Sequence, residues 1–492
     1  MHSWINKLPD NSPLLSNADE AWDKATLLKK IARIKESLSQ RKNPHAPVGI
    51  LSDNHPEWLA IDLATQSLGI TLVPLPSFFT PSQWVHTIRT SGMQAIFCAH
   101  DELARNLGFV FKNSYAGHFG LFESASSINS LLHDVDLTDV QKITFTSGTT
   151  SEPKGVCLST AQQWAVAESL ETILRPLAIK KHLNCLPLAV LLENIAGAYT
   201  ALLCGAENIC LPLAEVGLHG ASAFDANTCL NAIAQYQIES VILLPQMLQA
   251  MTAACEVHDE RIKSLKFVAV GGAKTPVALI ESARSKGIPA YEGYGLSECS
   301  SVVALNTPSH QKTGSVGKAL PNRKIRISPE GEIEISGQGS TRYLGHETSD
   351  QEWLATGDLG HLDEEGFLYI DGRKKNILIT SFGRNVSPEW PESLLIGQTE
   401  IAQAVVIGDG QAFLSALIVP SSSLISQDQL EAAVQRVNQD LPDYARLGAW
   451  FTAEPLTTNN GLATANGRPK RTEILKQYEQ QLNAIYSGAV IQ

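Results

Sequence analysis

Short apolar segments alternate with longer amphipathic segments along most of this chain, and this alternation restricts the fold more than any other feature of the sequence. Neighbouring parallel strands must be joined by a crossover, which is usually a helix. The pattern therefore predicts an α/β fold in which helices cover a parallel sheet. The expected strands are residues 47–51, 71–74, 95–99, 240–244 and 265–270, with a further strand opening at 290–291, and the expected helices are residues 58–68, 82–91, 162–174, 246–254 and 276–285.

The character of the sequence changes after residue 306 and again near Arg373. Between these points, strand patterns joined by a Pro-Glu-Gly turn replace the alternation. Beyond Arg373 lie two further strand patterns and a helix, the content of a small α+β unit. We therefore expect a large N-terminal domain over residues 1–372 and a small C-terminal domain over residues 373–492. The expected strands here are residues 324–328, 332–336, 367–370, 404–407 and 413–419, and the expected helix is residues 427–438.

The length and composition of the chain agree with this division. The 492 residues are too many for one hydrophobic core. Hydrophobic residues make up 43% and charged residues 18% of the chain, which is typical of a globular protein. The formal net charge of −12 argues against a nucleic-acid partner and against binding to an anionic membrane by charge alone.

The eight cysteines are scattered, without a C-x-x-C pair or the spacing of zinc ligands. They predict reduced, mostly buried thiols in a cytoplasmic protein. The first residues lack the basic start and apolar run of a signal peptide. The most apolar region, residues 183–213, is interrupted by Pro187, Glu193 and three asparagines, so we expect it to be buried core rather than a membrane span.

Residues 144–156 combine hydroxyl groups, glycines and one lysine, Lys154, in a short span. Glycine allows close approach of the backbone, hydroxyl and backbone N–H groups donate hydrogen bonds, and lysine supplies charge, so such a loop can enclose a phosphate chain. The spacing differs from that of a Walker A loop, and a polar surface loop is the simpler alternative. The hydroxyl-bearing residues are Thr146, Ser147, Thr149 and Thr150, and the glycines are Gly148 and Gly155.

This segment closely resembles the phosphate-binding loop of the adenylate-forming (ANL) superfamily, which comprises acyl-CoA synthetases, peptide-synthetase adenylation domains and luciferases. The resemblance extends in family order over residues 45–475, and the motif variants are most similar to those of long-chain fatty acyl-CoA synthetases. It implies a large N-terminal domain, built from α/β-sandwich subdomains and a small β-barrel-like subdomain, followed by a small, mobile α+β C-terminal domain.

Residues 291–298 form a glycine-rich stretch that carries an aromatic ring, a hydroxyl group and a carboxylate. A flat ring can lie against a planar base, and a carboxylate is a hard oxygen ligand for Mg²⁺. By resemblance, Tyr294 stacks on adenine, Ser297 contacts phosphate, and Glu298 holds the metal together with Thr150. A strand-to-turn connection with a core tyrosine is the alternative. The resemblance also assigns Glu292, Gly293 and Gly295 to the nucleotide site.

Three further segments supply expected nucleotide contacts. Gly272 and Ala273 follow an apolar strand, where a bare backbone lets a ligand ring approach, although a tight strand–helix turn explains them equally well. Asp358 and Arg373 suit the oxygens of a ribose, as the family's aspartate and arginine do, and a plain turn is the alternative for Asp358. The resemblance adds Ile370 to this set.

The basic segment 372–389 resembles the hinge of the family, with Lys375 at the hinge position and Gly383 at the glycine that lines the thiol tunnel. A solvated turn is the alternative. The segment 186–193 resembles a long-chain synthetase segment in which Val190 replaces a common histidine. The loss of a polar group there favours an apolar acid, and an ordinary buried helix start is the alternative.

Near the C-terminus the sequence departs from the family pattern. Relatives carry a Gly-Lys-x-x-Arg-like segment whose lysine bridges carboxylate and phosphate during adenylation, and here that position is Arg468. Arginine keeps the charge but is a planar fork rather than a point charge. We assign the role to Arg468; a shift of Lys470 into the position and a weakened adenylation step are the alternatives. The expected catalytic residues are thus Lys154, Glu298, Lys375 and Arg468.

The resemblance implies that the chain activates a carboxylic acid to acyl-AMP and transfers the acyl group to the thiol of CoA, with Mg²⁺ as cofactor and ATP and CoA as cosubstrates. The motif variants indicate a medium- to long-chain fatty acid. Two alternatives stay open. One is a ligase that loads the phosphopantetheine arm of a separate carrier protein, and the other is a catalytically weak acyl- or nucleotide-binding member, suggested by Arg468, Val190 and by Ser151 in place of a glycine. We expect at most peripheral membrane contact, because the sequence shows no amphipathic basic helix.

Overall fold

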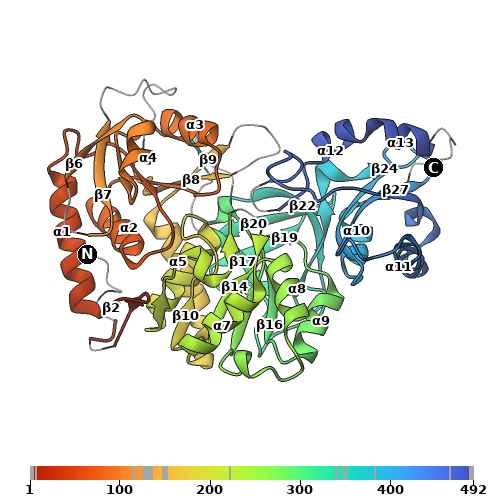
Figure 1. Cartoon of the computed structure of the whole chain (residues 1–492), viewed down its shortest axis with the longest axis horizontal. Helices are drawn as coiled ribbons and strands as arrows, with labels where there is room; N and C mark the ends of the chain where they lie inside the picture. The colour runs from red at the N-terminus through yellow and green to blue at the C-terminus, as the bar shows by residue number, and fades with distance from the viewer. Residues whose placement is uncertain are drawn as a thin grey trace.

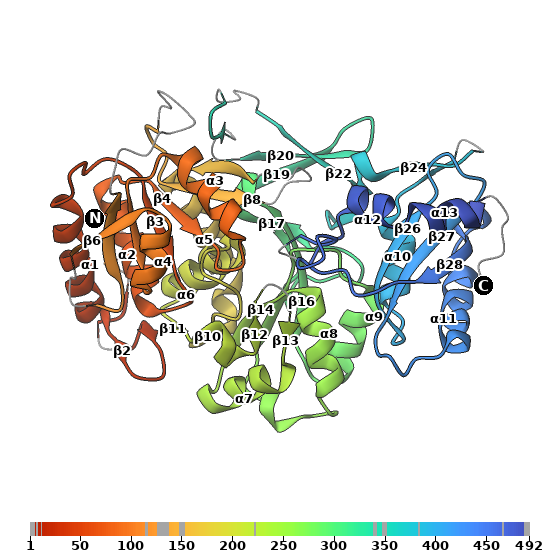
Figure 2. The same cartoon turned by 45° about the horizontal axis from the view of Figure 1, so that its top comes forward.

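In the computed structural model, the N-terminal part of the chain lies at one end of the molecule and the C-terminal part at the other, with the middle of the chain between them (Figure 1). The view in Figure 2 shows the same order. The structure describes residues 5, 8–10, 12–113, 117–124, 137–146, 153–220, 223–337, 342–346, 352–381, 384–464 and 467–486.

An eight-stranded sheet near the N-terminus contains the predicted parallel strands at its centre. Helix α2 (Pro56–Leu68) starts with a proline after the capping residue His55 and ends at Gly69, which has a left-handed backbone (φ 64°). The same proline start and glycine end bound α3 (Pro81–Ser91). In spatial order the strands are β21 (Arg342–Tyr343), β9 (Lys154–Leu158), β8 (Lys142–Thr146), β4 (Leu72–Leu75), β3 (Val48–Leu51), β5 (Ala95–Cys98), β7 (Gly120–Ser124) and β6 (Phe109–Asn113).

A nine-stranded sheet forms the middle of the molecule, with parallel strands at its centre and antiparallel strands at its edges. Its central strands confirm the second half of the predicted alternation. In spatial order the strands are β18 (Lys318–Ala319), β17 (Ser301–Leu305), β16 (Ala290–Leu296), β15 (Phe267–Val270), β14 (Ser240–Leu243), β10 (Lys181–Leu183), β11 (Glu207–Ile209), β1 (Leu15–Ser16) and β2 (Ala21–Trp22).

Strand β16 differs from its predicted form. The sequence indicated a glycine-rich turn within residues 291–298, whereas β16 continues through this stretch as far as Leu296. It pairs in parallel with β15 and then in antiparallel with β17, and the register shifts between Tyr294 and Gly295. A Cβ atom at Gly295 would lie only 1.9 Å from the carbonyl oxygen of Ser301, so this glycine is required for the two strands to approach.

Helices cover both sheets, and most residues of the apolar region 183–213 are buried, as predicted. It contains a π-helix, Leu192–Tyr199, which packs against α5 (Thr160–Leu174) and continues into α6 (Thr200–Leu203). Helical periodicity does not reveal a π-helix, because each of its turns is wider by one residue. The other helices of this part are α1 (Lys24–Ser39), α4 (Asp101–Asn106), α7 (Ala226–Tyr236), α8 (Pro245–Ala254) and α9 (Val277–Ser285).

A fully buried ion pair connects the first sheet to the π-helix. Lys142 of β8 lies 2.8 Å from Asp62 of α2, and neither side chain is exposed to solvent. Tyr199 donates its hydroxyl hydrogen to the same Asp62 oxygen at 2.6 Å, and Asn194 donates to it at 3.1 Å. Strand β8, which leads into the predicted phosphate-binding loop, is thereby held against the π-helix.

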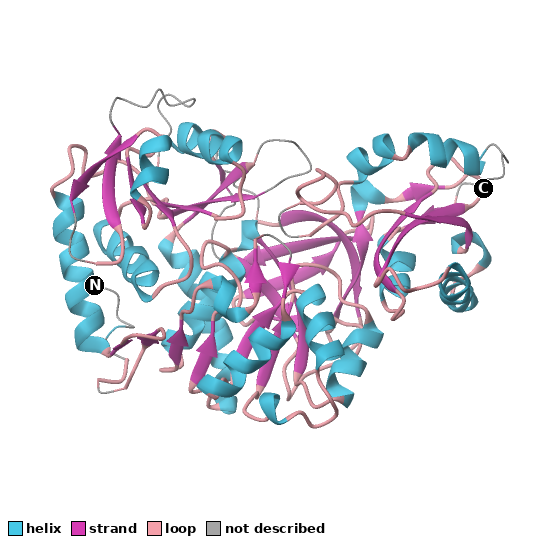
Figure 3. Cartoon of the chain, in the orientation of Figure 1, coloured by secondary structure: helices cyan, strands magenta, loops and turns pink. Residues whose placement is uncertain are grey.

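Two smaller sheets follow. The subdomain that we expected to be β-barrel-like is a four-stranded antiparallel sheet. In the C-terminal part, helices flank a three-stranded sheet (Figure 3), and a hydrophobic cluster packs on each face of that sheet. The strands of the four-stranded sheet are β19 (Arg323–Ile327), β20 (Glu332–Gly337), β22 (Leu354–Leu362) and β23 (Leu368–Arg373). The C-terminal elements are the strands β26 (Ile401–Ile407), β27 (Leu414–Pro420) and β28 (Leu447–Thr452) and the helices α10 (Glu389–Ile396), α11 (Gln427–Asp440), α12 (Arg471–Gln477) and α13 (Glu479–Tyr486). Two short two-stranded sheets pair β12 (Leu218–His219) with β13 (Ala223–Phe224) and β24 (Leu378–Ile379) with β25 (Asn385–Val386).

All eight cysteines are free thiols, and all except Cys204 are buried, as predicted. Within the described parts of the chain, no helix combines the length and the apolar character needed to cross a membrane.

Candidate active site

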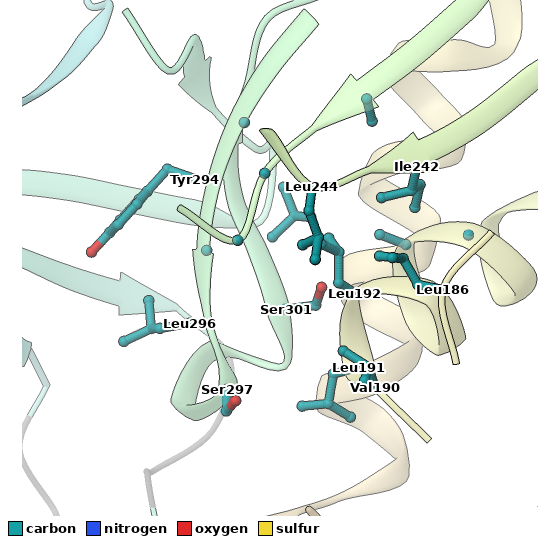
Figure 4. Close-up of a pocket in the computed structure, with 18 of the residues that line it drawn as sticks. Leu186, Val190, Leu191, Leu192, Ile242, Leu244, Tyr294, Leu296, Ser297 and Ser301 are labelled. Atoms are coloured by element: carbon teal, nitrogen blue, oxygen red, sulfur yellow. The ribbon is translucent and has the colours of Figure 1, made fainter. Parts of the chain in front are cut away.

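One cavity of about 440 Å³ brings nine of the predicted site residues together with an apolar region. Figure 4 shows Leu186, Leu192, Ile242 and Leu244 gathered on one side of it, and Tyr294 on another. The predicted site residues that line the cavity are Gly272, Gly293, Tyr294, Gly295, Ser297, Glu298, Arg373, Lys375 and Arg468.

Tyr294, Asp358 and Arg373 form one hydrogen-bonded group at the polar end of the cavity. The Tyr294 hydroxyl donates to Asp358 Oδ2 at 2.6 Å, and Arg373 Nε lies 2.6 Å from Asp358 Oδ1. The register of β22 with β23 places Asp358 directly opposite Arg373. Burial raises the pKa of Asp358 and Arg373 opposes the shift, while burial followed by the charge of Asp358 raises the pKa of Tyr294. The predicted ribose-binding pair and the predicted adenine-stacking ring are therefore direct neighbours.

Arg468 enters this group from the C-terminal part of the chain. Its Nε donates to the carbonyl oxygen of Gly272 at 3.1 Å, and a second guanidinium nitrogen donates to the same oxygen. A tight turn presents the side chain, because Thr464 N donates to the Arg468 carbonyl at 2.7 Å and Arg468 N donates to the Thr464 hydroxyl at 3.1 Å. Among the described residues that line the cavity, Arg468 is present and Lys470 is not.

The polar end of the cavity is rich in positive charge. Lys375 lies in the short turn Lys374–Asn376 that follows β23, and burial, then Arg373 and Arg468, lower its pKa. Arg468 is exposed, but the protein atoms crowded around its guanidinium group, and then Arg373, lower its pKa. The charge of Lys154, at the start of β9, also acts on Lys375. Such a group of cations suits a polyphosphate.

Glu298 lies in the turn Ser297–Cys299 after β16, and its Oε1 accepts a hydrogen bond from the Tyr343 hydroxyl at 2.6 Å. Pairing of β21 with β9 brings Tyr343 here, a residue that carried no motif signal in the sequence. Among the described residues, no group of three or more histidines, cysteines or carboxylates is placed to hold a metal ion. One carboxylate nevertheless fits Mg²⁺, which takes one or two carboxylates together with substrate phosphates and water.

Some predicted residues lie behind the cavity wall or outside the described residues. Glu292 is buried and accepts a hydrogen bond from Thr275 N at 3.0 Å, and burial raises its pKa to about 7. The Ile370 carbonyl accepts a hydrogen bond from Lys274, which follows Ala273 in the chain. Asp358 is likewise set back from the lining. The backbone of Thr146 ends β8 opposite Lys154, while Ser147, Gly148, Thr149, Thr150 and Gly383 lie outside the described residues.

The apolar part of the cavity follows the two parallel strands β14 and β15. Its wall is built by these strands and by the π-helix opposite them, and Val190 also lines it. Sequence reasoning missed most of these residues, because apolar strand and helix residues carry no motif. The strand and π-helix residues in this wall are Ser240, Val241, Ile242, Phe267, Ala269, Val270, Leu192, Ala196 and Gly197.

Comparisons with known proteins agree with this geometry. The sequence profile described as "AMP-binding enzyme" matches residues 4–343, and the profile described as "AMP-binding enzyme C-terminal domain" matches residues 375–490. The chain therefore belongs to the AMP-binding enzyme family of the adenylate-forming superfamily.

Individual relatives are similar over different shares of the chain. A 2-succinylbenzoate–CoA ligase of Bacillus pumilus is 27% identical over 417 residues, covering 79% of this chain and 80% of that protein. The long-chain-fatty-acid–CoA ligase FadD15 of Mycobacterium bovis is 33% identical over 250 residues, covering 44% of this chain and 41% of that protein. The solved structure of O-succinylbenzoate coenzyme A synthetase from Bacillus subtilis, in complex with ATP and a magnesium ion, has a TM-score of 0.74 and 22% identity, covering 96% of this chain and 98% of that one.

These similarities confirm the predicted family and the predicted α/β fold with a large N-terminal and a small C-terminal domain. They also support the enzyme type, an AMP-forming acid–CoA ligase. They do not confirm the predicted fatty-acid substrate, because the relative matched over most of this chain is named for a different acid.

Proposed function

We propose that the chain is a cytoplasmic ligase that activates a medium- to long-chain, largely apolar carboxylic acid as its acyl-adenylate and transfers the acyl group to CoA. The observation that carries this proposal is the single cavity that joins the cationic group around Arg468 to an apolar wall along β14 and β15. An ATP phosphate chain suits the first part, and a hydrocarbon chain suits the second.

The adenylation step follows from the charges at the polar end. A carboxylic acid is already ionised at neutral pH, so no general base is required, and the barrier comes from bringing an anion against the α-phosphate. Arg468 and Lys154 would offset this repulsion, and Glu298 with Thr150 would hold Mg²⁺, which neutralises phosphate charge when bound. Tyr294 would stack on adenine, and Asp358 with Arg373 would bind the ribose.

Other residues are also proposed to contact or support the nucleotide. Gly272, Ala273, Gly293 and Gly295 would let the nucleotide approach the backbone, and Ser297 would donate to phosphate. Glu292 and Ile370 would support these segments from behind. The loop residues Thr146, Ser147, Gly148, Thr149 and Thr150 would enclose the phosphates.

We assign residues 1–372 to the N-terminal domain and residues 373–492 to the C-terminal domain. For the thiol step, the C-terminal domain would rotate about Lys375. Arg468 occupies the cavity next to Gly272 in the present arrangement, so a thiol could reach the same place only after the C-terminal part has moved. Gly383 would then line the path of the thiol. A carrier-protein phosphopantetheine arm is the alternative acceptor, and parallel assays with CoA and with a loaded carrier protein would distinguish the two.

A second candidate substrate is an aromatic acid, which the name of the Bacillus pumilus relative favours. ATP–pyrophosphate exchange across saturated fatty acids of increasing length, with 2-succinylbenzoate and benzoate as aromatic members, separates the two candidates. We expect exchange to rise with chain length to a maximum and to be weak with both aromatic acids. A maximum for 2-succinylbenzoate would overturn the fatty-acid assignment. No ATP-dependent acyl-hydroxamate with any acid would overturn the enzyme assignment.

A further inference from the structure

Two buried polar side chains interrupt the apolar wall of the cavity, and a third lies behind them. His182 of β10 and Ser240 of β14 both line it, and Glu193 of the π-helix lies behind them. Their exposed fractions are 4%, 5% and 0%. His182 Nδ1 lies 2.9 Å from Ser240 Oγ, and His182 Nε2 lies 2.9 Å from Glu193 Oε1. We call these three residues the polar trio.

The hydrogen bonds that Glu193 accepts determine which atoms donate and which accept in the polar trio. Its Oε2 accepts from Leu186 N at 2.8 Å, and its Oε1 accepts from Asn184 Nδ2 at 3.2 Å as well as from His182. A carboxylate only accepts, so His182 Nε2 carries the hydrogen. In a neutral imidazole Nδ1 is then the acceptor, and the Ser240 hydroxyl donates to it. Ser240 Oγ consequently keeps an accepting lone pair beside the cavity.

The position of the polar trio is remote from the reacting end. Ser240 opens β14, whereas Leu244, which follows the strand, lies beside Gly272 near the nucleotide end. At a rise of about 3.3 Å per residue, these two positions are roughly 13 Å apart. A bound acid with its carboxylate at the cationic end would therefore direct the opposite end of its chain toward Ser240.

The structure is built around this polar trio. A Cβ atom at Gly197 of the π-helix would lie 2.2 Å from Glu193 Oε1 and 2.7 Å from His182 Nε2, so only glycine leaves room for the pair. An apolar chain end would leave the accepting lone pair of Ser240 without a donor, so the hydroxyl would make only its bond to His182. A chain end that donates a hydrogen bond would satisfy it.

On the basis of the proposed function, we infer that the preferred acid carries a hydroxyl group at or near the end remote from its carboxylate, and that this hydroxyl donates to Ser240 Oγ. Ser240 is thus a specificity-determining residue, and His182 and Glu193 are positioning residues that fix the direction of its hydrogen bond. The substrate class is that of hydroxylated fatty acids with an apolar body.

The experiment compares kcat/KM for decanoic and ω-hydroxydecanoic acid, and for the corresponding octanoic and dodecanoic pairs, in the complete ATP- and CoA-dependent reaction. For at least one length we expect the hydroxy acid to be preferred about tenfold. Ser240→Ala should bring that ratio close to one through loss with the hydroxy acid alone. Because each ratio is measured within one preparation, a reduced folded fraction cancels.

The matched control is Thr200→Val, which removes another hydroxyl of the cavity wall. Thr200 Oγ1 already donates to the Ile195 carbonyl at 3.2 Å, so the preference should stay unchanged. The inference is overturned if the wild-type protein prefers the plain acid at every length, if Ser240→Ala keeps the preference, or if ω-carboxy acids are preferred, since these accept rather than donate. The proposed function fails separately, when no acid of either series yields acyl-CoA.

Discussion

The guanidinium group of Arg468 donates hydrogen bonds to the carbonyl oxygen of Gly272, 196 residues earlier in the chain. This contact places a C-terminal cation beside Tyr294 and Arg373, in the proposed nucleotide site. Lys470, the other candidate from the sequence, caps the start of α12 with its backbone and does not line the cavity.

Arg468→Ala should therefore lower ATP–pyrophosphate exchange by on the order of 100-fold, because a preorganised cation at the developing charge is lost. Arg468→Lys should restore part of the rate. Lys470→Ala should stay within about threefold of the wild-type protein. A large loss in Lys470→Ala together with a mild one in Arg468→Ala would reverse the assignment.

The buried carboxyl group of Glu292 should make stability depend on pH. Burial raises its pKa from the ordinary 4.5 to about 7, so the folded protein retains a proton that the unfolded chain has released. The stabilising contribution is complete below about pH 4.5 and is lost as the pH rises through about 7. Glu292→Gln should reduce this decline in the free energy of unfolding by on the order of 3 kcal/mol.

The measurement is denaturant unfolding of the ligand-free protein across that pH range. Some decline should persist in the variant, because burial also raises the pKa of Glu392 to about 7 in the C-terminal part. An identical pH slope in wild-type protein and Glu292→Gln would contradict the prediction.

Gly295→Ala should destabilise the protein by about 1–3 kcal/mol, because the new Cβ atom meets the Ser301 backbone rather than a movable side chain. Gly271→Ala is the matched control, since its Cβ atom would have no neighbour closer than 3.5 Å. Thermal unfolding of the two variants side by side is the measurement. Equal melting temperatures would show that β16 and β17 can separate locally at little cost.

The buried pair of Lys142 and Asp62 should tolerate joint but not single replacement. Lys142→Met leaves Asp62 charged and without its cation, which should cost about 3–5 kcal/mol, whereas Lys142→Met with Asp62→Leu should recover much of the loss. The exposed pair of Arg175 and Glu171 serves as the comparison, and Arg175→Ala should leave the melting temperature unchanged. A single variant as stable as the double variant would contradict the prediction.

The sequence predicted those parts of the fold in which local rules coincide with tertiary structure. The strand–helix alternation from β3 to β5 and from β14 to α9 was confirmed, because apolar strands and capped helices carry strong local signals. The π-helix and the continuation of β16 through its glycines were missed, since both depend on packing against other segments.

The candidate site likewise contains residues that the sequence predicted and residues that it did not. Tyr294, Arg373 and Arg468 lie in short motifs and are brought together in the structure as expected. Strand pairing brings Tyr343, His182 and Ser240 to the cavity, and the π-helix brings Glu193 behind them. The spacing of these residues in the sequence does not predict that they lie together. The residues that we propose for the nucleotide lie in recognisable local patterns, whereas those that we propose for selecting the acid are distributed over the core.

The cavity lies along β14 and β15, two central strands of the nine-stranded sheet whose residues are mostly buried. Small side chains at Ser240, Ala269 and Gly271 leave this space open. If the proposed hydrocarbon chain lies there, it would fill this space, and the bound acid would then stabilise the folded enzyme. The melting temperature should accordingly rise with the concentration of the acid, and the central sheet should be least stable when no acid is bound.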